Sequence, residues 1–137
     1  MFEHFDHTAD LGLRVRAGTL EELLAEAGRG LLAMIVANPA SVRPVQTRTI
    51  ELPLGEPSLL LFDWLTELLY AFESDKLLLG EFDVQLAGGQ LTATCRGERM
   101  DANRHEMDHE VKAITYHGLR AQQNADGGWL AEVIVDI

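Results

Sequence analysis

The order of hydrophobic periodicities along the chain constrains the fold most strongly. Two segments with helical spacing, residues 20–35 and 58–72, each follow one alternating segment, and further alternating segments run on to the C-terminus. Strands gathered after the helices favour an α+β architecture over a doubly wound parallel sheet. A chain of 137 residues suits one domain. We therefore expect residues 1–137 to form a single α+β domain of order β-α-β-α followed by antiparallel strands.

Alternation of apolar and polar residues locates the strands. In residues 11–17, Leu11, Leu13 and Val15 share one face. Further strands are expected at residues 50–54, 82–86, 91–95, 111–123 and 129–136. Gly88 and Gly89 predict a tight hairpin turn, and residues 124–128 (NADGG) predict a second one.

The two helices have their own start signals. Thr19 with Glu22 three residues later is typical of a capping box, and Ser58 is the expected N-cap of the second helix. Gly28 and Gly30 weaken the first helix, which indicates that another element packs closely there.

Charge and cysteine content exclude several classes of protein. Eleven Lys and Arg against 22 Asp and Glu give a formal net charge of −11, which disfavours tight direct nucleic-acid binding and suits cations or a basic protein partner. The single cysteine, Cys95, excludes an intrachain disulfide and a four-cysteine zinc site, and we expect it to be a buried small residue. The acidic N-terminus and the short apolar runs predict neither a signal peptide nor a membrane span, so a cytoplasmic location is expected.

Residues 105–109 (HEMDH) match the H-E-x-x-H zinc-hydrolase motif. That motif needs a helix, on which both imidazoles face one zinc ion and the glutamate acts as general base. The segment is short and polar, and a strand-like run begins directly after it. We interpret the match as accidental and the segment as a solvated loop.

Four other residues are candidates for a site. Asp10 and Asp136, together with the terminal carboxylate of Ile137, would form a hard oxygen site for Mg²⁺, Ca²⁺ or Mn²⁺ if the fold brought them together. Taken singly, each is more typical of turn chemistry or of a solvated terminus. Lys112 is one of only two lysines, although an ordinary surface lysine is the alternative. On a strand it would share its face with Ile114 and Tyr116.

Four stretches together resemble the archease family. They are residues 7–13 (HTADLGL), 64–70 (WLTELLY), 111–117 (VKAITYH) and 133–137 (VIVDI), and their spacing covers essentially the whole chain. One departure is Thr66, where the family usually has asparagine.

The resemblance implies a fold and a function. The family fold is similar to a three-layer arrangement with helices between sheets. Archeases assist RtcB-type RNA ligases, which use GTP and Mn²⁺ in tRNA splicing and RNA repair; they promote the ligase–GMP intermediate and multiple turnover without being enzymes themselves. By motif match, the resemblance implies Asp10, Asp136 and Ile137 as a divalent metal site and Lys112 as the functional lysine.

Two other functions stay open at this point. One is a chaperone-like protein-interaction module, and the other is the zinc hydrolase of residues 105–109. A chaperone should help unrelated clients equally, whereas a zinc hydrolase should bind Zn²⁺ stoichiometrically through His105 and His109.

Overall fold

The structure is a computed structural model that describes residues 1–7 and 10–137, without the side chain of His7. The described residues form eight strands, two α-helices and one short 3-10 helix. In chain order these are β1 (Phe2–His7), β2 (Asp10–Ala17), α1 (Leu20–Ile35), η1 (Pro39–Ser41), β3 (Gln46–Pro53), α2 (Pro57–Asp75), β4 (Leu77–Ala87), β5 (Gln90–Arg99), β6 (Ala113–Ile114), β7 (Arg120–Gln123) and β8 (Trp129–Asp136).

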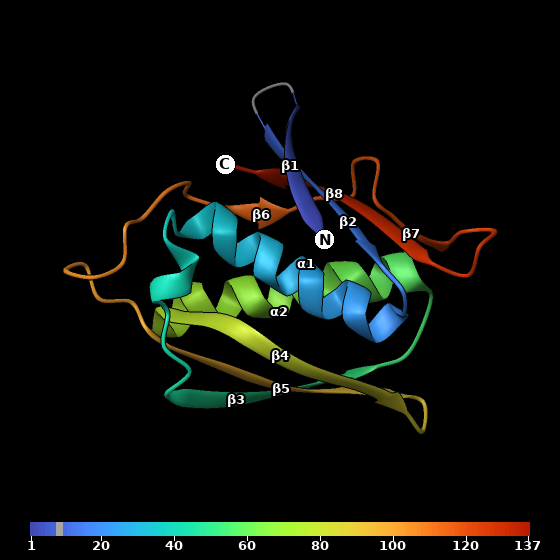
Figure 1. Cartoon of the computed structure of the whole chain (residues 1–137), viewed down its shortest axis with the longest axis horizontal. Helices are drawn as coiled ribbons and strands as arrows, with labels where there is room; N and C mark the ends of the chain where they lie inside the picture. The colour runs from blue at the N-terminus through green and yellow to red at the C-terminus, as the bar shows by residue number, and fades with distance from the viewer. Residues whose placement is uncertain (8–9) are drawn as a thin grey trace.

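Two antiparallel sheets enclose both helices in three layers (Figure 1). The larger sheet has the order β1-β2-β8-β6, with β7 also paired to β8, and the smaller sheet has the order β3-β5-β4. Helix α1 packs against β2 and β4, and α2 packs against β4 and β7, so each helix touches both sheets. The expected α+β class and the three-layer arrangement are confirmed.

The core lies around the two helices. Leu13, Trp64 and Leu65 are fully buried, and Trp64 Nε1 donates a hydrogen bond of 2.7 Å to the Leu24 carbonyl. A Cβ atom on Gly28 would lie 2.8 Å from the Phe82 ring, and one on Gly30 would lie 2.5 Å from Leu13. The close packing predicted at these glycines is therefore confirmed.

Local signals were read correctly at the turns and at the first cap. Gly88 and Gly89 have φ of 61° and 74° and join β4 to β5, as a tight hairpin requires. Thr19 Oγ1 accepts a hydrogen bond from the Glu22 amide at the start of α1. Helix α2 begins at Pro57, within one residue of the expected start, but the expected N-cap Ser58 is wrong: the Glu56 side chain caps the helix, with Pro57 in the first turn. The hydroxyl of Ser58 instead accepts from the Ala121 amide.

The strands depart from the sequence prediction in three ways. Strand β1 was not predicted, because residues 2–7 do not alternate strictly and form an edge strand paired only with β2. The long strand predicted over residues 111–123 is wrong: only Ala113–Ile114 and Arg120–Gln123 are strands, and Gly118 between them turns with a φ of 59°. The strands after α2, expected to follow one another in an antiparallel run, are instead divided between the two sheets: β4 and β5 join β3, whereas β6 to β8 join β2.

Within the described part of the chain, neither helix combines the length and the apolar character that a membrane span requires.

Candidate functional site at the end of the larger sheet

The register of the larger sheet places residues from the two ends of the chain side by side. Asp10 on β2 is directly opposite Asp136 on β8, and Asp136 is also opposite Ala113 on β6. The Lys112 amide donates a hydrogen bond of 2.7 Å to the Asp136 carbonyl. Because directly opposite residues of an antiparallel pair share a face, the Asp10 and Asp136 side chains lie on the same side of the sheet.

This side of the sheet faces away from the helices. The neighbours of the two aspartates along their strands, Leu11 and Val135, are buried in the core and are themselves a cross-strand pair. Asp136 is exposed and Asp10 is partly exposed. One step along the sheet, the Phe5 ring covers Gly12, where a Cβ atom would lie 2.3 Å from the ring. The two aspartates therefore lie at an accessible sheet end, bounded by a small apolar cover.

The C-terminus is held in the middle of this sheet. Strand β8 lies between β2 and β6, and the partly buried side chain of Ile137 packs against the core. Figure 1 shows the C-terminus beside the same end of the β1–β2 pair. A terminal carboxylate is normally a loose, solvated charge, but here the packing of Ile137 fixes its position next to Asp136.

Farther along the same face, the charges are already paired. Arg14 donates to Glu3 and to Glu132, each at 3.1 Å, and its hydrogen bond lowers the pKa of the Glu3 carboxyl. Burial raises the pKa of Glu132, but Arg120 and Arg14 lower it further. These arginines are therefore held by the carboxylates of Glu3 and Glu132.

The donor chemistry of the sheet end fits a hard divalent cation. Among the residues that the structure describes, no three His, Cys, Asp or Glu side chains gather in a way that could hold a metal ion. The predicted set contains only two such side chains, and its third donor is the terminal carboxylate, so that result leaves it untested. Three carboxylates at one sheet end are ligands of the kind that Ca²⁺, Mg²⁺ and Mn²⁺ prefer. Thr8, Ala9 and the His7 side chain of the predicted motif lie outside the described residues.

Lys112, whose amide donates to the Asp136 carbonyl, lies at the edge of a hollow. The hollow has a volume of about 270 Å³ and lies between α2 and residues 112–114. Lys112 is exposed, Ile114 is buried, and both line the hollow. The continuous strand predicted over residues 111–123 is wrong, as described above. Lys112 and Ile114 nevertheless both line this hollow. Within the described chain, the Lys112 ammonium forms no ion pair.

Residues 105–109, by contrast, do not have the geometry of a zinc motif. The segment is not helical. His105 is buried, its Nδ1 accepts from the Asp101 amide at 2.8 Å, and its Nε2 lies 3.0 Å from Glu98 Oε2. Because Nδ1 is an acceptor, Nε2 carries the hydrogen and donates to Glu98. Both ring nitrogens are therefore occupied, and the helix that the motif requires is absent from this segment. The expected solvated loop is wrong at His105, which is buried.

This segment instead closes the end of α1. The amides of Asp108 and His109 donate to the carbonyls of Ile35 and Met34, which are helix-end groups that lack an internal partner. Glu98 anchors the segment from β5, since it also accepts from Arg104 and from the Arg43 amide. Burial raises the Glu98 pKa, but these hydrogen bonds lower it further, to about 2. No local sequence signal indicates this network, because its members come from separate segments.

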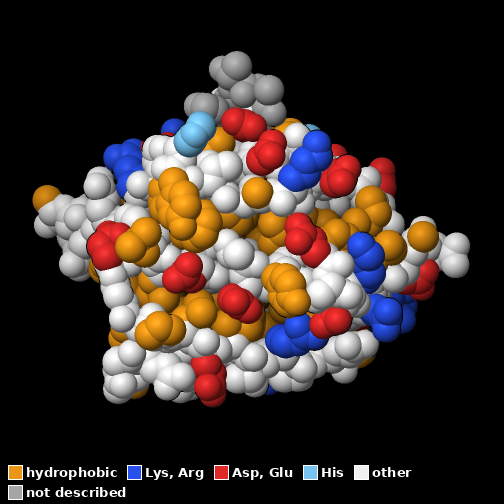
Figure 2. Space-filling model, turned by 180° about the vertical axis from the view of Figure 1, so that it is seen from behind, with side chains coloured by type: hydrophobic (Ala, Val, Ile, Leu, Met, Phe, Trp, Pro, Cys, Tyr) orange, Lys and Arg blue, Asp and Glu red, His pale blue; other side chains and the backbone are white. Residues whose placement is uncertain are grey.

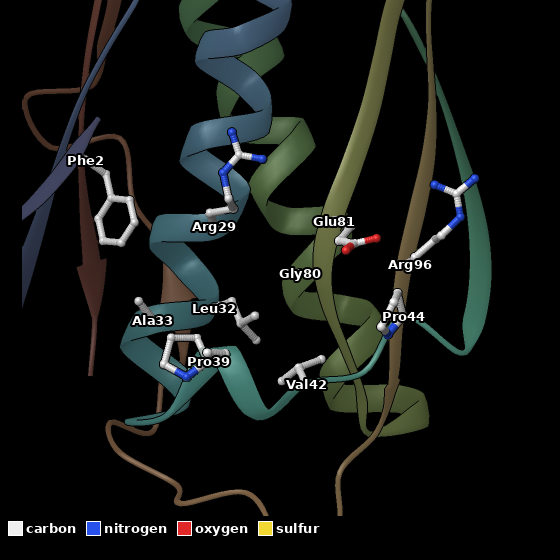
Figure 3. Close-up of a pocket in the computed structure, with 11 residues that line it drawn as sticks. Phe2, Arg29, Leu32, Ala33, Pro39, Val42, Pro44, Gly80, Glu81 and Arg96 are labelled. Carbon is white, nitrogen blue, oxygen red and sulfur yellow. The ribbon is translucent and has the colours of Figure 1, made fainter.

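A larger cavity of about 340 Å³ lies between α1, η1 and β4 (Figure 3). Its walls are mainly apolar, with Leu32 and Val42 among them, and Arg29, Glu81 and Arg96 at its rim. Phe2, at the end of β1 remote from Asp10, is also part of the lining. The cavity therefore shares no residue with the sheet end.

Cys95 is fully buried as predicted, and burial raises its pKa to about 12, so it is not a nucleophile.

Comparison with known proteins decides the family. The model of the Archease protein family (MTH1598/TM1083) matches residues 2–137. The chain belongs to the archease family. It is 39% identical to the protein archease of Methanopyrus kandleri and 36% identical to that of Thermococcus gammatolerans, in each case over 99% of this chain and at least 98% of the relative.

Solved structures agree with this assignment. The solution structure of Methanobacterium thermoautotrophicum protein 1598 superimposes with a TM-score of 0.87 at 32% identity, covering 99% of this chain and 98% of that one. A crystal structure from Thermotoga maritima, described as an archease and possible chaperone, matches with a TM-score of 0.70 at 24% identity and supports the fold alone. The archease resemblance expected from the four sequence stretches is therefore confirmed.

Proposed function

We propose that this archease-family chain is an accessory activator of an RtcB-type RNA ligase and not itself an enzyme. In this role it promotes formation of the ligase–GMP intermediate and multiple turnover in tRNA splicing and RNA repair. The observation that carries the proposal is the strand register, which puts Asp10 opposite Asp136 and hydrogen-bonds Lys112 to the Asp136 carbonyl. In this proposal the partner ligase carries out the RNA-joining reaction, and this chain supplies charged groups at one end of its larger sheet.

Asp10, Asp136 and the Ile137 carboxylate would hold a divalent ion, either Ca²⁺, Mg²⁺ or Mn²⁺. When bound, such an ion supplies positive charge that carboxylates and phosphates can share. The chain's part is positional: antiparallel pairing sets the two aspartates on one face, and core packing of Ile137 restrains the end of the chain that would supply the third carboxylate. Without a cation, three neighbouring carboxylates repel one another, so binding also relieves a local charge conflict.

The charges of the chain favour transient binding to a nucleotide-binding enzyme. A net charge of −11 steers the molecule toward a basic active-site mouth and away from free RNA. The exposed Lys112 is then a local positive charge in an acidic molecule, placed to meet phosphate oxygens of GTP or an acidic ligase residue. Its stem lies along the hollow with Ile114, which reduces the cost of ordering it.

The test is a guanylylation assay with a cognate RtcB-type ligase. We expect the wild-type chain to speed formation of ligase–GMP, Lys112→Ala to abolish the effect, and Lys112→Arg to lose most of it because reach and shape change. Lys76→Ala is the matched control, since Lys76 is the other lysine and its ammonium lies 5.2 Å from the Phe72 ring centroid. It should stimulate like the wild type.

One outcome would reject the proposal, and another would remove Lys112 from it. One is equal help to the cognate ligase and to unrelated clients, which would favour the chaperone-like module. The other is more than half of the stimulation retained in Lys112→Ala, which would reduce Lys112 to ordinary surface charge.

A further inference from the structure

The outer face of α2 carries exposed apolar side chains that the core does not use. Leu59 is 53% exposed and Tyr70 is 61% exposed. Beside them Tyr116, 63% exposed, stacks on Phe62 with ring centroids 4.0 Å apart and an angle of 12° between the planes. Single exposed apolar residues are ordinary, but several of them on one helix face next to a hollow are typical of an interaction surface.

The hollow described above runs along this face. Tyr70, Leu69 and Phe62 line it from the helix, and Lys112 and Ile114 line it from the other side. Its volume of about 270 Å³ gives room for a large side chain from a partner. The lining joins α2 directly to the segment that carries Lys112, so an occupant of the hollow would lie against the base of that side chain.

The charge of this face is one-sided. Helix α2 contains Asp63, Glu67, Glu73 and Asp75 and no Lys or Arg. Asp75 pairs with Arg48 at 2.6 Å, whereas the other three carboxylates are exposed and form no ion pair with any residue in the described ranges. Figure 2, seen from the α2 side, shows hydrophobic side chains across the middle of this face with acidic ones among them.

Two of these carboxylates also lie where a helix tolerates them least. Glu73 and Asp75 are in the last turn of α2, which has no basic residue. The negative end of the helix dipole disfavours carboxylates there, typically by a few tenths of a kcal/mol. A cationic partner would relieve this cost at Glu73, whereas Asp75 already has Arg48.

We propose that the outer face of α2 is the docking surface for a basic surface of the ligase. An apolar or aromatic side chain of the partner fills the hollow, and its Arg or Lys side chains pair with Asp63, Glu67 and Glu73. The inference rests on the proposed function for the identity of the partner. A second copy of this chain is a poor occupant, because it would bring the same carboxylates face to face. Docking here would leave Lys112 at the rim of the interface, ready to act.

The experiment titrates each variant against a fixed amount of ligase and measures both binding and the half-saturating concentration for guanylylation. We expect Tyr70→Ala to raise the half-saturating concentration about tenfold, as for a buried interface tyrosine. Glu73→Lys should raise it by a similar factor and weaken its salt dependence, because one attractive charge becomes repulsive. Both residues are exposed, so the unfolding midpoints should stay near that of the wild type.

Matched controls lie away from this face. Val45→Ala shortens another exposed apolar side chain, 68% exposed, in the connection before β3. Asp83→Lys makes the same charge change on the exposed side of β4. Both should leave the half-saturating concentration within about twofold, since rim and remote charges change binding little.

The outcomes separate this inference from the proposed function. If the wild-type chain neither binds nor stimulates the ligase, the proposed function is wrong and this inference falls with it. If the wild type stimulates but Tyr70→Ala and Glu73→Lys titrate like the two controls, only the docking surface is wrong. Concentration-dependent dimerisation that Tyr70→Ala removes would instead assign the face to a second copy and would overturn the inference.

Discussion

The segment 105–109 and the end of the larger sheet both carry metal-binding residue types, and the fold treats them in opposite ways. In the segment, His105 is buried and both of its ring nitrogens are used inside the protein. At the sheet end, Asp10 and Asp136 share one face and Asp136 is exposed. The imidazole of His105 is enclosed by the fold, whereas the carboxylate of Asp136 lies at an accessible sheet end.

The contrast shows what makes a candidate ligand available. The motif in residues 105–109 has the correct letters but not the helix that would turn both imidazoles to one side. Asp10 and Asp136 have no motif in common, and only strand pairing unites them. Spacing in the sequence is therefore informative only when the local structure that it assumes is present.

The largest expected effect is on the buried network. Glu98→Gln should lower the free energy of unfolding by about 3 kcal/mol, because the half-buried Arg104 keeps only the longer ion pair with Asp101 and the Arg43 amide and His105 lose a carboxylate acceptor. Urea unfolding would measure it, with the exposed Glu51→Gln as a control that should change by less than about 0.5 kcal/mol. A loss below about 1 kcal/mol would show that the network does not stabilise the segment.

The Glu98 carboxylate should also make the free energy of unfolding depend on pH. Its pKa is lowered from an ordinary value of 4.5 to about 2, so its contribution to stability is complete above pH 4.5 and is lost as the pH falls toward 2. The difference in unfolding free energy between wild type and Glu98→Gln should therefore narrow across that window. A difference that stayed constant from pH 6 to pH 3 would contradict the assigned hydrogen bonds.

A smaller effect is expected at the chain terminus. One glycine added after Ile137 moves the terminal carboxylate away from Asp136 and should weaken Ca²⁺ or Mn²⁺ binding about tenfold, or about 1.4 kcal/mol. Isothermal titration calorimetry would measure the affinity. His109→Ala is the matched control and should bind like the wild type. Equal affinity of the extended chain and the wild type would remove Ile137 from the proposed site.

The smallest effect is expected at His109, in contrast to His105. The exposed His109 can be changed to alanine with a stability change of less than about 0.5 kcal/mol, whereas His105→Ala should cost about 1–3 kcal/mol because Glu98 loses a buried donor. Neither change should alter Zn²⁺ uptake measured by elemental analysis. Stoichiometric zinc in the wild type that disappears in both variants would restore the hydrolase hypothesis.

Local sequence determined the parts of the fold that need only neighbouring residues. Helical spacing and the Thr19 cap located α1, and the paired glycines located the β4–β5 turn. Burial of Cys95 also followed from alternation along its strand. These features are set within a few residues, where side-chain periodicity and backbone sterics are sufficient.

Tertiary structure decided the rest, because strand pairing and burial depend on residues far apart in the chain. An edge strand such as β1 needs no strict alternation, and no local signal could divide the later strands between two sheets. The pairing of Asp10 with Asp136 follows from a register that the buried Leu11 and Val135 fix, since a slip of one residue would expose them. His105 is likewise unavailable to a metal because its ring contacts Glu98. Tertiary packing brings these two residues together, and their spacing in the sequence does not predict it.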